Sequence, residues 1–99
     1  MAHVTTDKKK LAAFCQEHHI RRLALFGSVL RAEPTGNSDV DVLVEFETGH
    51  VPGLFGIAAL ARELSPLFGG HTIDLRTPED LSRYFRKEVL AQAEVQYAA

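Results

Sequence analysis

The segment from Asp39 to Phe46 alternates between two kinds of side chain, and this constrains the fold more than any other part of the sequence. One set of alternate positions is apolar throughout: Val40, Val42, Val44 and Phe46. The other set begins with Asp39 and Asp41. Because side chains along a strand alternate between its two faces, the pattern predicts a strand with both carboxylates on one face and a hydrophobic core beneath the other. A shift of one residue would bury both aspartates, so the pattern also fixes the inward face.

A Gly-Ser pair follows the apolar segment Leu23 to Phe26, which is predicted to be a second strand in the middle of a covered sheet. We expect a short helix from about Ser28 to Ala32, and then a turn that makes the two strands neighbours. Gly27 would let a phosphate approach the backbone, and Ser28 can either cap the helix or donate its hydroxyl to a phosphate oxygen. Arg31, one turn later, can add charge beside a phosphate or form an ion pair that holds the turn.

Two carboxylates beside a phosphate site would repel the ligand unless a divalent cation such as Mg²⁺ lay between them. A third carboxylate is usual in such sites, and Asp74 offers one within the apolar segment Thr72 to Leu75. Three close carboxylates would repel one another by roughly a few kcal/mol per pair at an effective dielectric constant near 20, which a structural site would not tolerate. We therefore predict that Asp39, Asp41 and Asp74 bind metal. The alternative is that they are ordinary acids of turns and strand ends.

The motifs GSVLR, SDVDVLV and TIDL, in this order, resemble the pattern of the nucleotidyltransferase superfamily, which is Gly-Ser, Asp-x-Asp and a distal Asp. The endings VEFE and RTPEDL are similar to those of the minimal nucleotidyltransferase (MNT) domains that act as antitoxins in HEPN/MNT toxin-antitoxin pairs. The likeness extends over roughly residues 11 to 97. One departure is Ala32, because family members often have glycine directly after the arginine. This difference concerns the local turn rather than the chemistry.

The resemblance implies an α/β (α+β) fold, with a small mixed sheet of three to four strands flanked by helices. It also implies transfer of AMP from ATP to a tyrosine hydroxyl of a partner HEPN ribonuclease toxin, which is thereby neutralised. On this basis Asp39 and Asp41 would hold two Mg²⁺ ions, and Asp74 would complete the acceptor-side ion and help to take the acceptor proton. The nucleotide-binding residues would be Gly27, Ser28 and Arg31.

The composition narrows the class of protein. Ninety-nine residues, 45% of them hydrophobic, fit one compact domain over residues 1–99. The net charge of −2 disfavours nucleic acid as the main partner. Cys15 is the only cysteine, which excludes an internal disulfide, and no apolar run approaches the roughly 18 residues of a membrane span. We expect a cytoplasmic protein that is not bound to a membrane.

Further helices and a last strand are predicted outside the motifs. One helix, capped within Thr5 to Asp7, should extend to about His18, and another from Leu54 to Phe68 should cross the sheet. Thr77 should cap a final helix that runs to about Ala93, and Val95 to Tyr97 can add a short edge strand. The residues expected to be buried on these three helices are Leu11, Phe14, Cys15 and His18; Leu54, Ile57, Ala58, Ala61 and Leu64; and Leu81, Phe85 and Val89.

Histidine and cysteine give no sign of a second site. His18 and His19 close the first helix without a third ligand at a zinc-binding spacing, so the five histidines are not expected to form a metal site. Cys15 lies on the apolar face of that helix and is expected to be a buried small hydrophobe rather than a nucleophile.

Two other functions remain open from the sequence. A non-catalytic antitoxin would block the toxin by binding alone, but it would have no need of the Gly-Ser and aspartate motifs. A small-molecule nucleotidyltransferase of the aminoglycoside-modifying type would need a second domain to form its acceptor pocket, and 99 residues leave no room for one.

Overall fold

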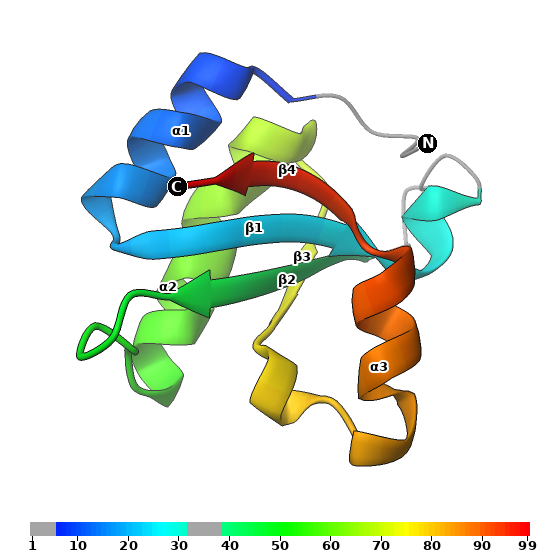
Figure 1. Cartoon of the computed structure of the whole chain (residues 1–99). Coiled ribbons are helices and arrows are strands. Elements are labelled where there is room, and N and C mark those ends of the chain that lie inside the picture. Colours follow the sequence, from blue (N-terminus) through cyan, green and yellow to red (C-terminus); the bar gives the residue numbers. More distant parts are fainter. Residues whose placement is uncertain (1–5, 32–38) are drawn as a thin grey trace.

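The computed structural model describes residues 6–31 and 39–99. In chain order its elements are α1 (Lys8–Glu17), β1 (Ile20–Phe26), the 3-10 helix η1 (Gly27–Leu30), β2 (Val40–Phe46), α2 (Leu54–Leu64), the 3-10 helix η2 (Ser65–Phe68), β3 (Ile73–Arg76), the 3-10 helix η3 (Pro78–Asp80), α3 (Arg83–Gln92) and β4 (Glu94–Ala98) (Figure 1). None of the helices in the described part of the chain is long and apolar enough to cross a membrane. The predicted cap at Thr5, the helix end at Ala32 and the turn at Pro34 to Asn37 lie outside the described residues.

The strands form one mixed sheet in the order β3-β2-β1-β4. β1 is antiparallel to β2 and to β4, whereas β2 and β3 are parallel. A parallel pair needs a crossover connection, which α2 supplies here. The predicted fold class, the central position of the first strand and the short edge strand near the C-terminus are confirmed, although β1 already begins at Ile20.

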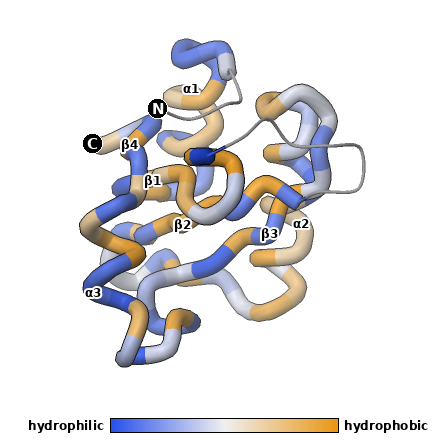
Figure 2. The backbone as a smooth tube through the Cα atoms, turned by 90° about the vertical axis from the view of Figure 1, so that its right-hand side faces the viewer, coloured by the Kyte–Doolittle hydropathy of each residue, from blue (hydrophilic) through white to orange (hydrophobic). Residues whose placement is uncertain are grey.

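The core lies between one face of the sheet and the helices α1 and α2. Three of the predicted inward side chains of β2 are fully buried, namely Val40, Val42 and Val44, and the fourth, Phe46, is partly buried against them. Leu11 of α1 and Leu64 of α2 belong to the same hydrophobic cluster and are also fully buried. Figure 2 shows the hydrophobic stretches of the central strands inside the molecule. Burial of each such side chain stabilises the fold by about 1.5 to 3 kcal/mol.

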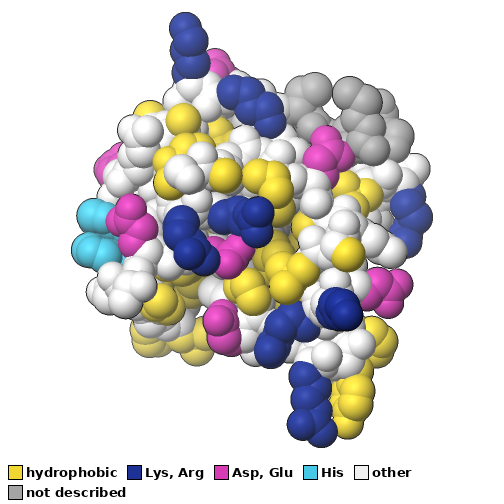
Figure 3. Space-filling model, viewed as in Figure 1, with side chains coloured by type: hydrophobic (Ala, Val, Ile, Leu, Met, Phe, Trp, Pro, Cys, Tyr) yellow, Lys and Arg dark blue, Asp and Glu magenta, His cyan; other side chains and the backbone are white. Residues whose placement is uncertain are grey.

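The other face of the sheet is partly open. α2 lies behind the sheet in Figure 1, and the same view in Figure 3 shows basic and acidic side chains near the middle of the face, beside apolar ones. Ala24 and Leu43 are buried on this face, where they and Leu90 of α3 line a small cavity of about 60 Å³. α3 therefore covers only part of the face.

The helix predicted over Leu54 to Phe68 is in fact two helices. α2 ends at Leu64 and η2 follows, because Pro66 has no N–H to donate within an α-helix. Part of the predicted buried face is also wrong, since Leu54 is 84% exposed and Ala58 is exposed. The buried residues of α2 lie in its second half, so its first turn extends beyond the core.

The single helix predicted after Thr77 is also divided, into the 3-10 helix η3 and the α-helix α3. Thr77 and Asp80 form the expected capping box, with the Thr77 N–H donating to Asp80 Oδ2 at 3.1 Å, but they cap only η3. The backbone is extended at Leu81, and Ser82 then caps α3.

The predicted buried stripe of Leu81, Phe85 and Val89 is wrong at Phe85, which is 62% exposed, while Leu81 and Val89 are half-buried. No residue of α3 is fully buried. The break at Leu81 also places that residue outside α3, so the three residues do not share one helical face.

Candidate active site

The register between β2 and β3 brings two of the predicted aspartates together. Asp41 of β2 is the direct partner of Asp74 of β3, so both side chains leave the same face of the sheet. Asp39 directly precedes β2, is exposed, and acts electrostatically on Asp41. The three carboxylates therefore gather where β2 and β3 begin.

The pKa of Asp41 is raised by its surroundings in the cluster. Partial burial raises the pKa of Asp41 above its usual value, and the charge of Asp74 and a hydrogen bond between the two side chains raise this pKa further. Asp39 acts in the same direction, while the positive charge of Arg76 opposes the shift. The surroundings of Asp41 therefore make its free anion less favourable than that of an exposed aspartate, and a bound cation would offset this effect.

Arg76 is a part of this site that the sequence analysis missed. It lies two residues after Asp74 on β3 and therefore on the same face, and its Nε donates to Asp74 Oδ1 at 3.0 Å. The predicted strand ended at Leu75, one residue before Arg76, so the Asp-x-Arg spacing would have been a signal only if the strand had been extended by one residue. In the metal-free protein, Arg76 partly offsets the charge of the cluster.

Gly27 touches the carboxylate of Asp41. Its φ of 77° lies in the left-handed region, and a Cβ atom built on it would lie 2.2 Å from Asp41 Oδ2. This contact arises because Phe26 and Asp41 are partners in the β1–β2 register, so the chain turns away from β1 directly beside the carboxylate. Only glycine fits both the backbone conformation and the space.

Ser28 and Arg31 lie on and after η1, which is a 3-10 helix and not the predicted α-helix. The prediction that Ser28 can cap this helix is wrong, because the cap position belongs to Phe26. Ser28 and Arg31 are exposed, whereas the intervening Val29 is buried and anchors the turn. Within the described residues, neither exposed side chain has a hydrogen-bond or ion-pair partner, so both are free to meet a ligand.

A groove of about 440 Å³ borders the cluster along β3. Asp74, Arg76 and Asp80 line its polar side, and the segment before α2, including Val51 and Leu54, lines its apolar side. A molecule bound in this groove would contact Asp74.

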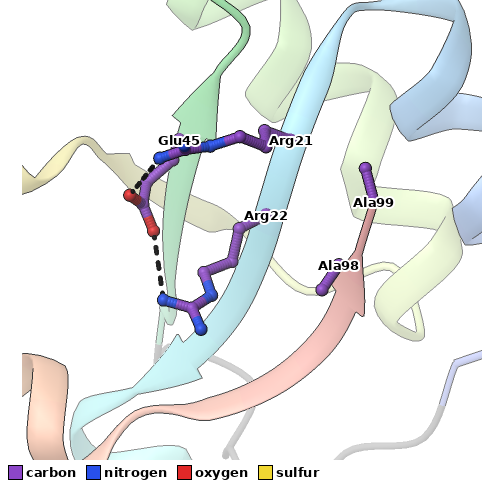
Figure 4. Close-up of a pocket in the computed structure, with 5 residues that line it drawn as sticks. All are labelled: Arg21, Arg22, Glu45, Ala98 and Ala99. Carbon is purple, nitrogen blue, oxygen red and sulfur yellow. Dashed lines mark hydrogen bonds and ion pairs between the residues drawn. The ribbon is translucent and has the colours of Figure 1, made fainter.

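A second hollow, of about 290 Å³, lies near the start of β1, away from Gly27 at its other end (Figure 4). There Glu45 pairs with Arg21 at 3.0 Å and with Arg22 at 3.6 Å. The Glu45 carboxylate of this hollow is therefore already held in ion pairs, and none of the described aspartates lines the hollow. The cluster around Asp41 is therefore the candidate active site.

The donor set of the cluster fits Mg²⁺. All of its ligand atoms are carboxylate oxygens, which hard divalent cations prefer. A bound cation would also relieve the like-charge repulsion that raises the pKa of Asp41. Asp39 is exposed, so its side chain can turn toward the other two.

Comparison with known protein families matches residues 9–98 to the family described as polymerase beta, nucleotidyltransferase. The chain belongs to this nucleotidyltransferase family. The protein adenylyltransferase MntA of Thermococcus cleftensis is 34% identical over 89 residues, which are 90% of this chain and 84% of that protein. A solved structure described as a minimal nucleotidyltransferase is 34% identical and has a TM-score of 0.69, covering 87% of this chain and 85% of its own.

Two more distant solved structures share the fold. One is a toxin-antitoxin complex with AMP-PNP; it is 19% identical, with a TM-score of 0.71 over 94% of this chain and 74% of that one. The other holds a tri-AMPylated Shewanella oneidensis HEPN toxin in complex with an MNT antitoxin; it is 18% identical, with a TM-score of 0.64 over 93% of this chain and 70% of that one.

Proposed function

We propose that this chain is a Mg²⁺-dependent protein adenylyltransferase and an antitoxin. It transfers AMP from ATP to a tyrosine hydroxyl of a partner HEPN ribonuclease toxin and so neutralises the toxin. The observation that carries the proposal is the contact of Gly27 with Asp41, which in turn pairs with Asp74. This arrangement joins the Gly-Ser turn and the carboxylates in one site. Residues 1–99 would act as a single domain in the cytoplasm, where the ribonuclease meets its RNA.

In this proposal Asp39 and Asp41 would hold two Mg²⁺ ions, and Asp74 would complete the ion on the acceptor side. When bound, the ions neutralise the charge that develops on the phosphates and on the leaving pyrophosphate. Gly27, which has no side chain, lets the Asp41 carboxylate approach the backbone beside the proposed phosphate site. Ser28 donates its hydroxyl to a phosphate oxygen, and Arg31 adds positive charge one turn later.

The proposed chemistry forms one bond and breaks another. The tyrosine oxygen bonds to the α-phosphorus of ATP, and the bond from that phosphorus to the pyrophosphate oxygen breaks, leaving the electron pair on pyrophosphate. Asp74 accepts the tyrosine proton. Arg76 orients Asp74 in the metal-free protein, because its Nε donates to Oδ1 of that carboxylate.

The groove beside Asp74 favours a protein acceptor over a small molecule. Its apolar side includes Val51, which is 67% exposed, and Leu54, and the next residue, Phe55, is 91% exposed. Exposed apolar side chains that adjoin a polar site are typical of a surface that another protein covers. A toxin segment that carries a tyrosine could therefore lie across these residues and reach Asp74.

The direct test is the mass of the toxin after incubation with this chain, ATP and Mg²⁺. We expect a mass gain of one AMP unit or a small multiple, and no gain when EDTA removes the metal. The control variant Glu88→Gln, an exposed acid on α3, should give the wild-type mass gain. Neutralisation of the toxin in cells without any mass change would contradict the proposal and favour an antitoxin that acts by binding alone.

Ser28→Ala tests the role of the free hydroxyl. Because Ser28 is exposed and caps no helix, we expect its melting temperature to stay within about 2 °C of the wild type, while ATP affinity falls roughly tenfold or more. The matched control is Ser82→Ala, which removes the cap of α3 and should lower stability by about 1 kcal/mol without changing ATP affinity. Calorimetric titration and thermal unfolding measure both. Unchanged ATP affinity in Ser28→Ala would remove Ser28 from the site.

A further inference from the structure

Three side chains with metal-binding groups meet at the end of the sheet opposite to the aspartates. His19 directly precedes β1, and Glu47 and His50 follow β2. The register pairs Ile20 with Phe46 at this end and Phe26 with Asp41 at the other, so the length of both strands separates the two clusters. Figure 3 shows histidine side chains gathered at one edge of the molecule, next to acidic ones.

The three side chains are already in contact. His19 Nδ1 lies 3.1 Å from Glu47 Oε2, and the rings of His19 and His50 stack with their centroids 3.8 Å apart. One ligand atom from each residue lies within 4.8 Å of the other two. All three residues are exposed, so these contacts are accessible to an ion from solution.

The backbone holds this arrangement in place. The Glu47 N–H donates to the His19 carbonyl at 2.9 Å, and the His50 N–H donates to the Glu47 carbonyl at 3.0 Å. His19 follows the cap of α1 with a φ of 57°, a left-handed conformation that favours glycine at this position of a helix end. The backbone of His19 is therefore in a conformation that is unfavourable for a residue with a side chain. That a histidine nevertheless stands there, beside Glu47 and His50, points to a role for the imidazole.

We propose that His19, Glu47 and His50 form a binding site for a transition-metal ion, with Zn²⁺ as the best match. Two imidazole nitrogens and one carboxylate oxygen are a common zinc donor set, and water can fill the fourth position of the tetrahedron. Zinc bonds of about 2.0 to 2.1 Å require the ligand atoms to close in, so the two rings must leave their stacked arrangement. Exposed side chains can make this movement.

The site differs in chemistry and in place from the aspartate cluster, whose oxygen ligands favour Mg²⁺. A zinc ion here would connect the end of α1 with the segment between β2 and α2. It would therefore act as a clip that restrains the segment leading to the exposed first turn of α2.

The test is a titration of the whole protein with ZnCl₂, followed by calorimetry and thermal unfolding. We expect the wild type to bind one Zn²⁺ per chain at this site and to unfold at a higher temperature. His50→Ala and Glu47→Gln should each weaken this binding by more than about tenfold. The control His71→Ala, a histidine outside the cluster, should leave it unchanged, and so should Asp41→Asn, which removes a ligand from the other site. Binding that survives His50→Ala, or that disappears with Asp41→Asn, would overturn the assignment.

His19→Gly separates metal binding from a structural role. Glycine adopts the backbone conformation of residue 19 freely, so the metal-free variant should unfold at the wild-type temperature or above. Its response to Zn²⁺ should nevertheless be lost. A variant that is less stable without metal, yet still gains stability from Zn²⁺ as the wild type does, would show that His19 serves the local fold alone.

Discussion

Asp41→Asn is expected to abolish AMP transfer while making the metal-free protein more stable near neutral pH. The substitution is nearly isosteric and removes a ligand that the proposed metal ions require, so transfer should fall by at least about a hundredfold. Stability should rise because Asp41 is partly buried beside two other carboxylates, which raise its pKa. The asparagine amide can still donate to Asp74, so the pairing of β2 with β3 is kept.

The gain in stability should depend on pH in a defined direction. In the unfolded chain Asp41 ionises near its ordinary pKa of 3.8, and in the folded protein it ionises at a higher pH. Between the pKa of Asp41 in the unfolded chain and its higher pKa in the folded protein, the unfolded state has already lost its proton while the folded state still holds it. The wild type therefore loses stability as the pH rises through this interval. Below the interval both states hold the proton and the two proteins should differ little. Above it the variant should unfold a few degrees higher.

Thermal unfolding in EDTA from pH 3 to pH 8, together with the toxin mass assay, measures both effects. Equal melting temperatures of variant and wild type at pH 7 would show that burial and the neighbouring carboxylates together do not destabilise the ionised Asp41 in the folded state. Undiminished AMP transfer by Asp41→Asn would remove this residue from the active site.

Gly27→Ala should reduce AMP transfer to a similar extent. Here the Asp41 carboxylate is displaced by the new methyl group, whereas in Asp41→Asn it is removed. The new Cβ would lie 2.2 Å from Asp41 Oδ2, so the carboxylate must turn away. A short side chain can rotate at little energetic cost, so the contact itself should destabilise the fold only slightly. The left-handed φ of 77° should cost about 1 to 2 kcal/mol for alanine, which corresponds to a fall of roughly 5 to 15 °C in melting temperature.

Gly70→Ala provides the matched control for this experiment. Gly70 has a φ of 81°, and nothing lies within 4 Å of a Cβ built on it. Both variants should therefore lose similar stability, while only Gly27→Ala should lose AMP transfer and Mg-ATP binding. If the two variants are equally active at a temperature where both are folded, the close approach of Gly27 to Asp41 has no part in the reaction.

The placement of the candidate site residues on one face of β2 was predictable, because it follows from strand periodicity. The alternation from Asp39 to Phe46 required one acidic face, and β2 has the predicted inward face, which is fully buried except at the partly buried Phe46. The pairing of Asp41 with Asp74 depends on the parallel order of β2 and β3, which no local pattern specifies. Arg76 was missed for a different reason. The predicted strand ended at Leu75, whereas β3 extends to Arg76 and places its side chain on the same face as Asp74.

The errors concern apolar residues that the fold leaves exposed. Helical spacing shows which side chains share a face but not whether another element covers it. Leu54 and Phe85 satisfy such spacing and are nevertheless exposed, because the buried residues of α2 lie in its second half and α3 covers only part of its face of the sheet. The meeting of His19 with Glu47 and His50 was missed because it is produced by antiparallel pairing between residues that are distant in sequence.

The order of the strands also bears on how the site comes into being during folding. β1 and β2 are antiparallel neighbours joined by a single connection, so their pairing can form early, and it brings Gly27 to Asp41. The connection from β2 to β3 contains α2 and is longer, so bringing β3 beside β2 has a larger entropic cost. We therefore expect Asp74 to join the cluster late, against the charge of carboxylates already in place. A partly folded chain would then carry the aspartates of β2 without Asp74 beside them, so the candidate site would be complete only once β3 has paired with β2.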